Sequence, residues 1–116
     1  MLKNYDLIVI GGGSGGVRAA RISASYGAKV ALCEQDRMGG TCVIRGCIPK
    51  KLLYYAANYK KSFINSKYYG WQLKAYKNNF KNFIISKNKE LKRLEDIYTV
   101  NAENSGVDIF KGKASF

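Results

Sequence analysis

The sequence predicts an α/β fold in which a strand, helix and strand of a parallel sheet are followed by an inserted antiparallel helical hairpin and a third strand. Two short apolar runs, at residues 6–10 and 29–34, flank a glycine-rich turn and one segment of helix length. Apolar residues at helical spacing then occupy most of residues 49–104. The 116 residues, 47% of them hydrophobic and one of them proline, are enough for one packed domain of modest core.

The first strand is predicted over Asp6–Ile10, because a β-branched apolar run stopped by glycines is typical of a strand buried on both faces of a parallel sheet. Six residues of glycine-rich turn follow it. Gly11, Gly13 and Gly16 fit the G-x-G-x-x-G spacing. In that motif one glycine makes the tight turn, one lets the backbone approach a pyrophosphate, and one packs the next helix on the strand.

The helix after this turn is predicted from about Ser14 to Tyr26, with Gly27 placed to end it. The second strand is predicted over Lys29–Glu34, and its last residue is an acid about twenty residues beyond the glycines. Glu34 is therefore where a ribose hydroxyl would be accepted. Together these features predict a partial Rossmann-like, dinucleotide-binding domain.

Two cysteines, Cys42 and Cys47, stand just before Pro49, a residue that can open a helix. Residues five apart in a regular helix have Cα atoms on the order of 8 to 9 Å apart, beyond the roughly 7 Å limit for a disulfide. A bridge between the two therefore requires a distorted turn, which Gly46 eases. A strained, accessible pair is typical of a labile, redox-active disulfide. The remaining Cys33 is interpreted as a buried strand residue.

A helix is predicted from Pro49 to about Asn65 and is broken at Tyr68-Tyr69-Gly70. A longer second helix is predicted from apolar residues spaced three and four apart between Leu73 and Tyr98, and Asn104-Ser105-Gly106 closes it. Such a pair forms an antiparallel hairpin. A third strand is predicted over Val107–Phe110.

The formal net charge of +12 comes mostly from twelve lysines and arginines between Lys50 and Arg93, with Glu90 as the lone acid there. Lysine, asparagine, tyrosine and isoleucine are enriched together, so we interpret the charge as solvated helix faces under a compositional bias. We predict no nucleic-acid partner. The alternative, a nucleic-acid binder, predicts a steep dependence of affinity on salt.

Three cysteines are too few for a secreted disulfide framework, and no apolar run approaches eighteen residues. No segment has the pattern of a secretory leader. We therefore expect a protein of the reducing cytoplasm with no membrane partner and no metal site. In that compartment a pair such as Cys42 and Cys47 is expected to cycle between thiol and disulfide.

The two cysteines lie within a longer motif over residues 39–51, which reads Gly-Gly-Thr-Cys-Val-Ile-Arg-Gly-Cys-Ile-Pro-Lys-Lys. With the glycine turn and Glu34, these residues closely resemble the N-terminal part of the class I flavoprotein disulfide reductases, the pyridine nucleotide-disulfide oxidoreductases. The resemblance covers essentially the whole chain. Within the family the glutathione reductases match best, because dihydrolipoamide dehydrogenases and mercuric reductases usually carry Pro-Ser-Lys where this chain has Pro49-Lys50-Lys51. A dihydrolipoamide dehydrogenase-like or trypanothione reductase-like enzyme and a non-catalytic FAD-binding module stay open as alternatives.

The resemblance implies that FAD lies at the glycine turn, with its pyrophosphate at Ser14 and Gly15 and its adenosine ribose at Glu34. Lys50 would approach the flavin ring, and the backbone near Ala114 would meet the adenine. The cofactor-binding residues implied in this way are Gly11, Gly13, Ser14, Gly15, Gly16, Glu34, Thr41, Cys42, Lys50 and Ala114.

The same resemblance implies Cys42, Cys47 and Lys50 as catalytic residues. Cys42 would attack glutathione disulfide, and Cys47 would face the flavin and close the bridge again. The helix start near Pro49 and the charge of Lys50 predict lowered cysteine pKa values. Ser14, Arg21 and Tyr98 match positions that contact glutathione disulfide in glutathione reductases.

By the same resemblance, residues 1–116 correspond to an incomplete FAD-binding domain. The NADPH-binding and dimer-interface domains of the family would follow it, and family members are homodimers. The family's general acid is a histidine of the other subunit, whereas this sequence contains no histidine. We therefore expect that the 116 residues alone do not turn over glutathione disulfide with NADPH.

Overall fold

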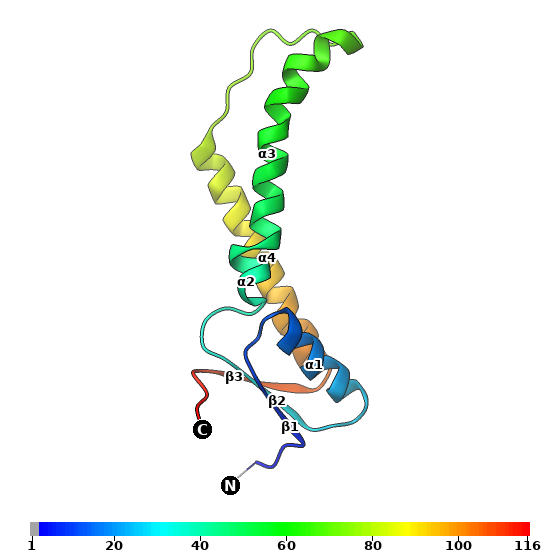
Figure 1. Ribbon diagram of the computed structural model, residues 1–116, viewed down its shortest axis with the longest axis vertical. Coiled ribbons are helices and arrows are strands. Elements are labelled where there is room, and N and C mark those ends of the chain that lie inside the picture. The colour runs from blue at the N-terminus through cyan, green and yellow to red at the C-terminus, as the bar shows by residue number, and fades with distance from the viewer. Residues whose placement is uncertain (1–2) are drawn as a thin grey trace.

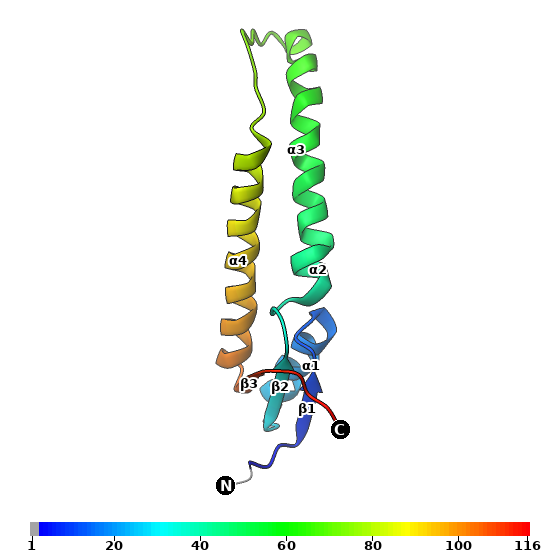
Figure 2. The ribbon, with the colours of Figure 1, turned by 90° about the vertical axis from the view of Figure 1, so that its left-hand side faces the viewer.

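The computed structural model describes residues 3–116 and forms an elongated α/β molecule (Figure 1). Its elements are β1 (Leu7–Ile10), α1 (Ser14–Ser25), β2 (Val30–Glu34), α2 (Gly40–Arg45), α3 (Cys47–Asn65), the 3₁₀ turn η1 (Ser66–Tyr69), α4 (Phe80–Asn104) and β3 (Val107–Lys111). The molecule extends over 68 × 26 × 19 Å and has a radius of gyration of 20.1 Å. A compact domain of this length has a radius of about 13 Å. The excess arises because α3 leads away from the sheet and α4 returns to it (Figures 1 and 2).

The sheet has three parallel strands in the order β1-β2-β3, so the sequence-based prediction of an α/β fold with a parallel sheet is confirmed. In its register Ile8 lies beside Ala31, and Ala31 lies beside Asp108. The central strand is the most buried, since Val30, Ala31 and Leu32 are at most 2% exposed. The carboxyl ends of all three strands therefore lie at one edge of the sheet, where the candidate site is built.

One face of the sheet is covered by α1 and α4, and this face holds the core. Its buried members are Val17, Ala20, Val30, Leu32, Met38, Ala102 and Val107. The opposite face is open among the described residues, with Ile8 60% and Ile10 54% exposed. The prediction that β1 is buried on both faces is therefore wrong, because no helix within residues 3–116 packs on its second face. Cys33 lies on that open face in register with Ile10 and Phe110 and is only half-buried.

The second long helix begins at Phe80, later than its apolar spacing predicts. Asn79 sets the start, because its side-chain oxygen accepts a hydrogen bond of 3.1 Å from the N–H of Asn82. Residues 70–79 are irregular. Tyr76 nevertheless packs on Phe63 of α3, with ring centroids 5.2 Å apart. It therefore makes an apolar contact although it does not lie in a helix.

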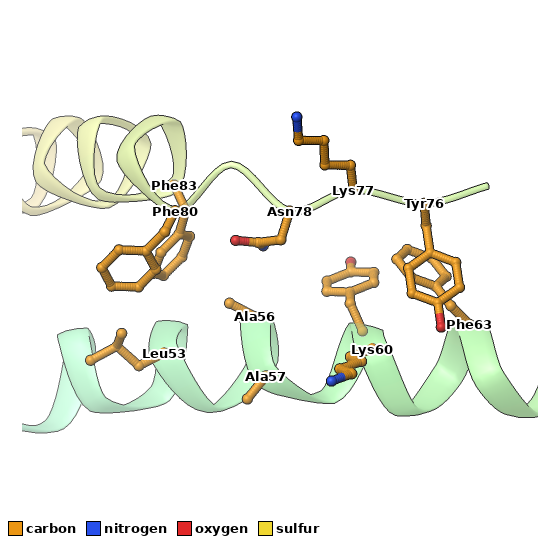
Figure 3. Close-up of a pocket in the computed structure, with 11 residues that line it drawn as sticks. Leu53, Ala56, Ala57, Lys60, Phe63, Tyr76, Lys77, Asn78, Phe80 and Phe83 are labelled. Carbon is orange, nitrogen blue, oxygen red and sulfur yellow. The ribbon is translucent and has the colours of Figure 1, made fainter.

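An open apolar groove of about 620 Å³ runs between α3 and the segment that leads into α4 (Figure 3). Leu53, Phe63, Tyr76, Phe80 and Phe83 line it. Within residues 3–116, no helix combines the length and the apolar character that a membrane span requires.

Candidate functional site

The glycine turn joins β1 directly to α1. Gly11 has φ +102° and its N–H donates to the Cys33 carbonyl at 2.8 Å, which places the turn at the end of the central strand. A Cβ on Gly16 would lie 1.9 Å from the Gly11 carbonyl oxygen. The two backbones therefore touch, as the third glycine of the motif predicts, and only glycine fits at position 16.

The outer side of the same turn is open. A Cβ added to Gly13 or Gly15 would meet no atom within 4 Å. Gly13 is the N-cap of α1 and supplies no side-chain hydrogen bond, and its carbonyl accepts from Val17 N–H at 2.9 Å. The first N–H groups of α1 thus face an open, electropositive cradle beside Ser14. This chemistry fits the pyrophosphate of a dinucleotide.

Glu34 closes the cradle on the side of β2. Its Oε2 accepts a hydrogen bond of 2.6 Å from Gly12 N–H, and its Oε1 accepts one of 2.7 Å from Asp36 N–H. A carboxylate has about four acceptor sites, so two stay available for a ligand hydroxyl. The carbonyl of Glu34 accepts a hydrogen bond of 2.8 Å from Gly112 N–H. This bond holds the segment after β3, which contains half-buried Ala114, beside Glu34.

A second glycine pair, which sequence reasoning did not count among the site residues, brings the cysteines to this cradle. Gly39 and Gly40 have φ +101° and +61°, and Gly39 N–H donates to the Gly12 carbonyl at 2.8 Å. A Cβ on Gly40 would lie 2.7 Å from the Cα of Gly13. Helix α2, which carries exposed Thr41, therefore begins in contact with the glycine turn. The adjacent glycines before Thr41 were the available signal.

Cys42 lies on α2, and Cys47 is the first residue of α3, two residues before the expected start at Pro49. The helix is interrupted at Gly46, where a Cβ would lie 2.9 Å from the Thr41 carbonyl oxygen. The distorted turn required for the two cysteines to meet is thus present. Both are free thiols in this structure, so the disulfide between them stays a prediction.

The two thiols differ in acidity. A hydrogen bond from the Cys47 thiol lowers the pKa of Cys42, and the Ser14 hydroxyl and the charge of Lys50 act in the same direction. The pKa of Cys47 is raised, because its proton is held by Cys42 and a second negative charge beside the first is unfavourable. The expected lowering is confirmed for Cys42 and wrong for Cys47. Of the two thiols, Cys42 therefore ionises more readily.

We expect iodoacetamide to alkylate half-buried Cys42 faster than exposed Cys47 near neutral pH, because only the thiolate reacts. Because the pKa of Cys42 is lowered, its alkylation rate should fall with decreasing pH at a midpoint below the ordinary thiol value of about 8.5. Ser14→Ala should raise that midpoint. Ser25→Ala should leave it unchanged, because the native Ser25 hydroxyl donates to the Ile22 carbonyl. Mass spectrometry of the labelled peptides measures both rates. Faster labelling of Cys47 would contradict the assignment.

Ser14, Arg21 and Tyr98 come together in an open cleft of about 540 Å³ between α1 and α4. Arg21 Nε donates to the Ser105 hydroxyl at 3.4 Å, so its guanidinium spans the cleft. The complete lining is Ser14, Val17, Arg18, Arg21, Ile22, Ser25, Tyr98, Asn101 and Ser105, which includes two arginines and no acid. Ser14 belongs both to this cleft and to the surroundings of Cys42.

Comparisons with known proteins bear on this arrangement. Residues 5–116 match the family described as pyridine nucleotide-disulphide oxidoreductase. The chain belongs to this family. It is 53% identical to a glutathione reductase of Burkholderia cepacia over 111 residues, and the match covers 96% of this chain and 25% of that protein. It is 47% identical over 115 residues to a glutathione reductase of Nostoc sp., which covers 99% of this chain and 25% of the relative.

A chloroplastic or mitochondrial glutathione reductase of Pisum sativum is 42% identical over 121 residues, covering 95% of this chain and 22% of that protein. The chain therefore spans about a quarter of the length of the curated relatives it matches. The resemblance to glutathione reductases inferred from the cysteine segment is confirmed. The roles of the individual site residues stay predictions.

Proposed function

We propose that the chain is the N-terminal part of an FAD-dependent glutathione-disulfide reductase, with residues 1–116 forming part of the FAD-binding domain. One observation carries the proposal: Ser14 lies beside the acidic thiol of Cys42 and also lines the cleft that holds Arg21 and Tyr98. The more acidic of the two thiols thus adjoins a cleft of suitable charge. The names of the related proteins support the same reaction.

The substrate chemistry follows from the cleft. Glutathione disulfide is a peptide with four carboxylates, and a cleft with two arginines and no acid favours an anionic ligand. The fork of Arg21 can bind two carboxylate oxygens at once. Tyr98 and Ser14 offer hydroxyl groups for the peptide's polar atoms.

The two cysteines of this chain can carry out the thiol exchange. The Cys42 thiolate attacks one sulfur of glutathione disulfide, so that a mixed disulfide forms and one glutathione thiolate leaves. Cys47, once deprotonated, attacks the Cys42 sulfur, forms the bridge and releases the second glutathione. The two cysteines lose two electrons and two protons, and the two glutathiones gain them. The positive charge of Lys50 stabilises both thiolates, so it helps to lower the pKa of Cys42 and opposes the rise in the pKa of Cys47.

The glycine cradle and Glu34 fit FAD, with the phosphates at the start of α1 and the ribose at the carboxylate. When bound, FAD supplies two-electron chemistry from NADPH, which restores the dithiol. Further parts of the proposal are a homodimer, a cytoplasmic location, and α3 and α4 as a hairpin inserted into the domain. The NADPH site would lie outside these residues.

A single-turnover reaction tests the proposal. The reduced chain should react faster with glutathione disulfide than with the uncharged bis(2-hydroxyethyl) disulfide, and loss of thiols measures both rates. Arg21→Gln should slow only the glutathione reaction, by about tenfold, because a charge-assisted contact is lost. Arg93→Gln, whose native guanidinium pairs with Glu90 on α4, is the matched control.

Equal rates with both disulfides in the wild-type chain would contradict the proposed substrate. A chain that retains FAD but shows no reaction at Cys42 would indicate a binding module without chemistry. Flavin fluorescence during titration with FAD separates that result from a chain that binds neither ligand.

A further inference from the structure

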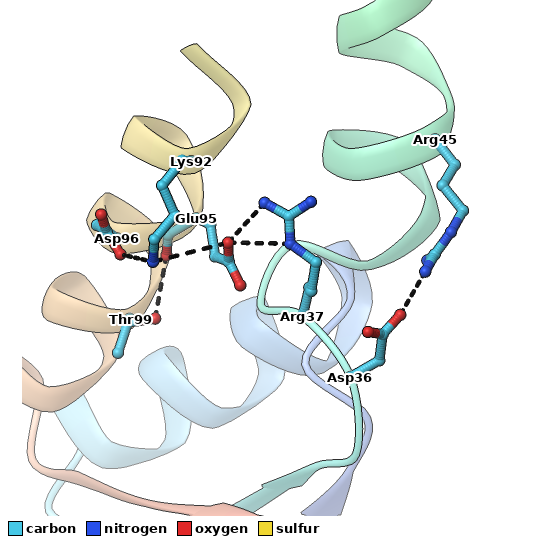
Figure 4. Close-up of polar contacts among 7 residues, drawn as sticks. All are labelled: Asp36, Arg37, Arg45, Lys92, Glu95, Asp96 and Thr99. Atoms are coloured by element: carbon cyan, nitrogen blue, oxygen red, sulfur yellow. Dashed lines mark hydrogen bonds and ion pairs between the residues drawn. The ribbon is translucent and has the colours of Figure 1, made fainter. Parts of the chain in front are cut away.

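The loop between β2 and α2 holds two helices through adjacent residues of opposite charge (Figure 4). Arg37 donates from Nε at 3.0 Å and from Nη2 at 2.7 Å to Oε2 of Glu95 on α4. Asp36 pairs with Nη2 of Arg45 on α2. The loop thus contacts α2, which carries Cys42, on one side and α4, which carries Tyr98, on the other.

The two ion pairs differ in burial. The Glu95 side chain is 15% exposed and the Arg37 side chain 35%, whereas Arg45 and Asp36 are 58% and 50% exposed. Exposed pairs contribute little, since water screens them and two long side chains must be ordered. A partly buried pair with two charge-assisted hydrogen bonds is stronger and fixes a geometry. The pair of Arg37 and Glu95 is therefore the stronger of the two contacts and restrains α4 against the loop.

Both partners of that pair are connected directly to the site. The Arg37 carbonyl accepts a hydrogen bond of 3.3 Å from Gly40 N–H, at the first residue of α2 and two residues before Cys42. Glu95 stands three residues before Tyr98 on α4, so the two side chains are neighbours on the helix surface. One ion pair thus links the start of the redox helix to the wall of the cleft.

We propose that Arg37 and Glu95 are positioning residues that hold the Tyr98 wall of the cleft at a fixed place relative to Cys42. The inference rests on the proposed function, because it concerns the same cleft and the same thiol exchange. Attack on a disulfide requires the reacting sulfurs roughly 3 to 3.5 Å apart and aligned. A substrate bound to α4 is presented to Cys42 correctly only if α4 does not shift. Neither residue needs to touch the substrate.

The test uses the reduced chain and the two disulfides named above. Arg37→Gln and Glu95→Gln should each slow the reaction with glutathione disulfide by about tenfold. The rate with bis(2-hydroxyethyl) disulfide and the pH midpoint of Cys42 alkylation should not change. The charge-reversed double variant Arg37→Glu with Glu95→Arg should recover most of the lost rate, and Asp36→Asn should match the wild type.

The sign of the Glu95→Gln effect separates positioning from simple electrostatics. If Arg37 only attracted the anionic substrate, removing a negative charge at Glu95 would speed the reaction, and that result would overturn the proposal. An equal effect of each variant on both disulfides would overturn it too, since it would indicate general destabilisation.

Hydrogen exchange distinguishes a failure of the inference from a failure of the proposed function. Arg37→Gln should increase amide exchange in residues 95–104 of α4 but not in α3, because the tether acts on α4. A wild-type chain that does not distinguish the two disulfides overturns the proposed function, and the exchange data then decide the inference. Unchanged exchange in α4 overturns the positioning role.

Discussion

Cys42→Ser is expected to abolish the reaction of the reduced chain with glutathione disulfide, with a loss of at least about a thousandfold. The serine hydroxyl is not ionised at neutral pH, whereas hydrogen bonds from Cys47 and Ser14 lower the pKa of the native thiol. The remaining Cys47 does not replace it, because Ser14 and the cleft that holds Arg21 and Tyr98 adjoin Cys42. Release of glutathione, measured with an enzymatic thiol assay, gives the rate.

Cys47→Ser is the matched variant and should behave in the opposite way. Cys42 can still attack, but no second thiol is available to resolve the product. A stable adduct of one glutathione on Cys42 should therefore accumulate, and intact-mass spectrometry detects it. An adduct on Cys47 in Cys42→Ser, with none on Cys42 in Cys47→Ser, would reverse the assigned roles.

The part of the fold that sequence could predict is the part fixed by local geometry. The spacing of Gly11, Gly13 and Gly16 reflects backbone contacts within one turn, and the structure contains the closest of them, between Gly16 and Gly11. The need for a distorted turn between Cys42 and Cys47 follows from helix dimensions alone. Both constraints are local and do not depend on the rest of the fold.

The features that could not be predicted depend on partners distant in sequence. Tyr76 has helical spacing from Phe80 but satisfies its apolar character against Phe63, so the segment stays irregular. The exposure of Ile8 depends on which face of the sheet the helices cover. Arg37 and Glu95 are 58 residues apart, and no local pattern indicates that they meet. The opposite pKa shifts of the two cysteines arise from their mutual contact, which spacing alone does not specify.

Gly16→Ala is expected to destabilise the chain by about 3 kcal/mol, a large fraction of the stability of a small domain. The added methyl group would lie 1.9 Å from the Gly11 carbonyl oxygen, 3.1 Å from the Gly11 carbonyl carbon and 3.3 Å from the Val9 side chain. Relief requires α1 to move off β1, which would open the core around Val17 and Ala20. The gain in helix propensity, about 1 kcal/mol, is too small to compensate. Urea denaturation followed by circular dichroism measures the difference.

Gly15→Ala isolates the cause, because it makes the same chemical change one residue earlier in the same helix. A Cβ at position 15 meets no atom within 4 Å, so only the propensity effect acts and stability should rise by up to about 1 kcal/mol. In the proposed FAD site Gly15 lies at the pyrophosphate, so the added methyl group should instead weaken FAD binding. Gly16→Ala loses stability through the contact with Gly11, whereas Gly15→Ala loses affinity without losing stability. Equal urea midpoints for the two variants would show that the packing of α1 on β1 does not depend on this glycine.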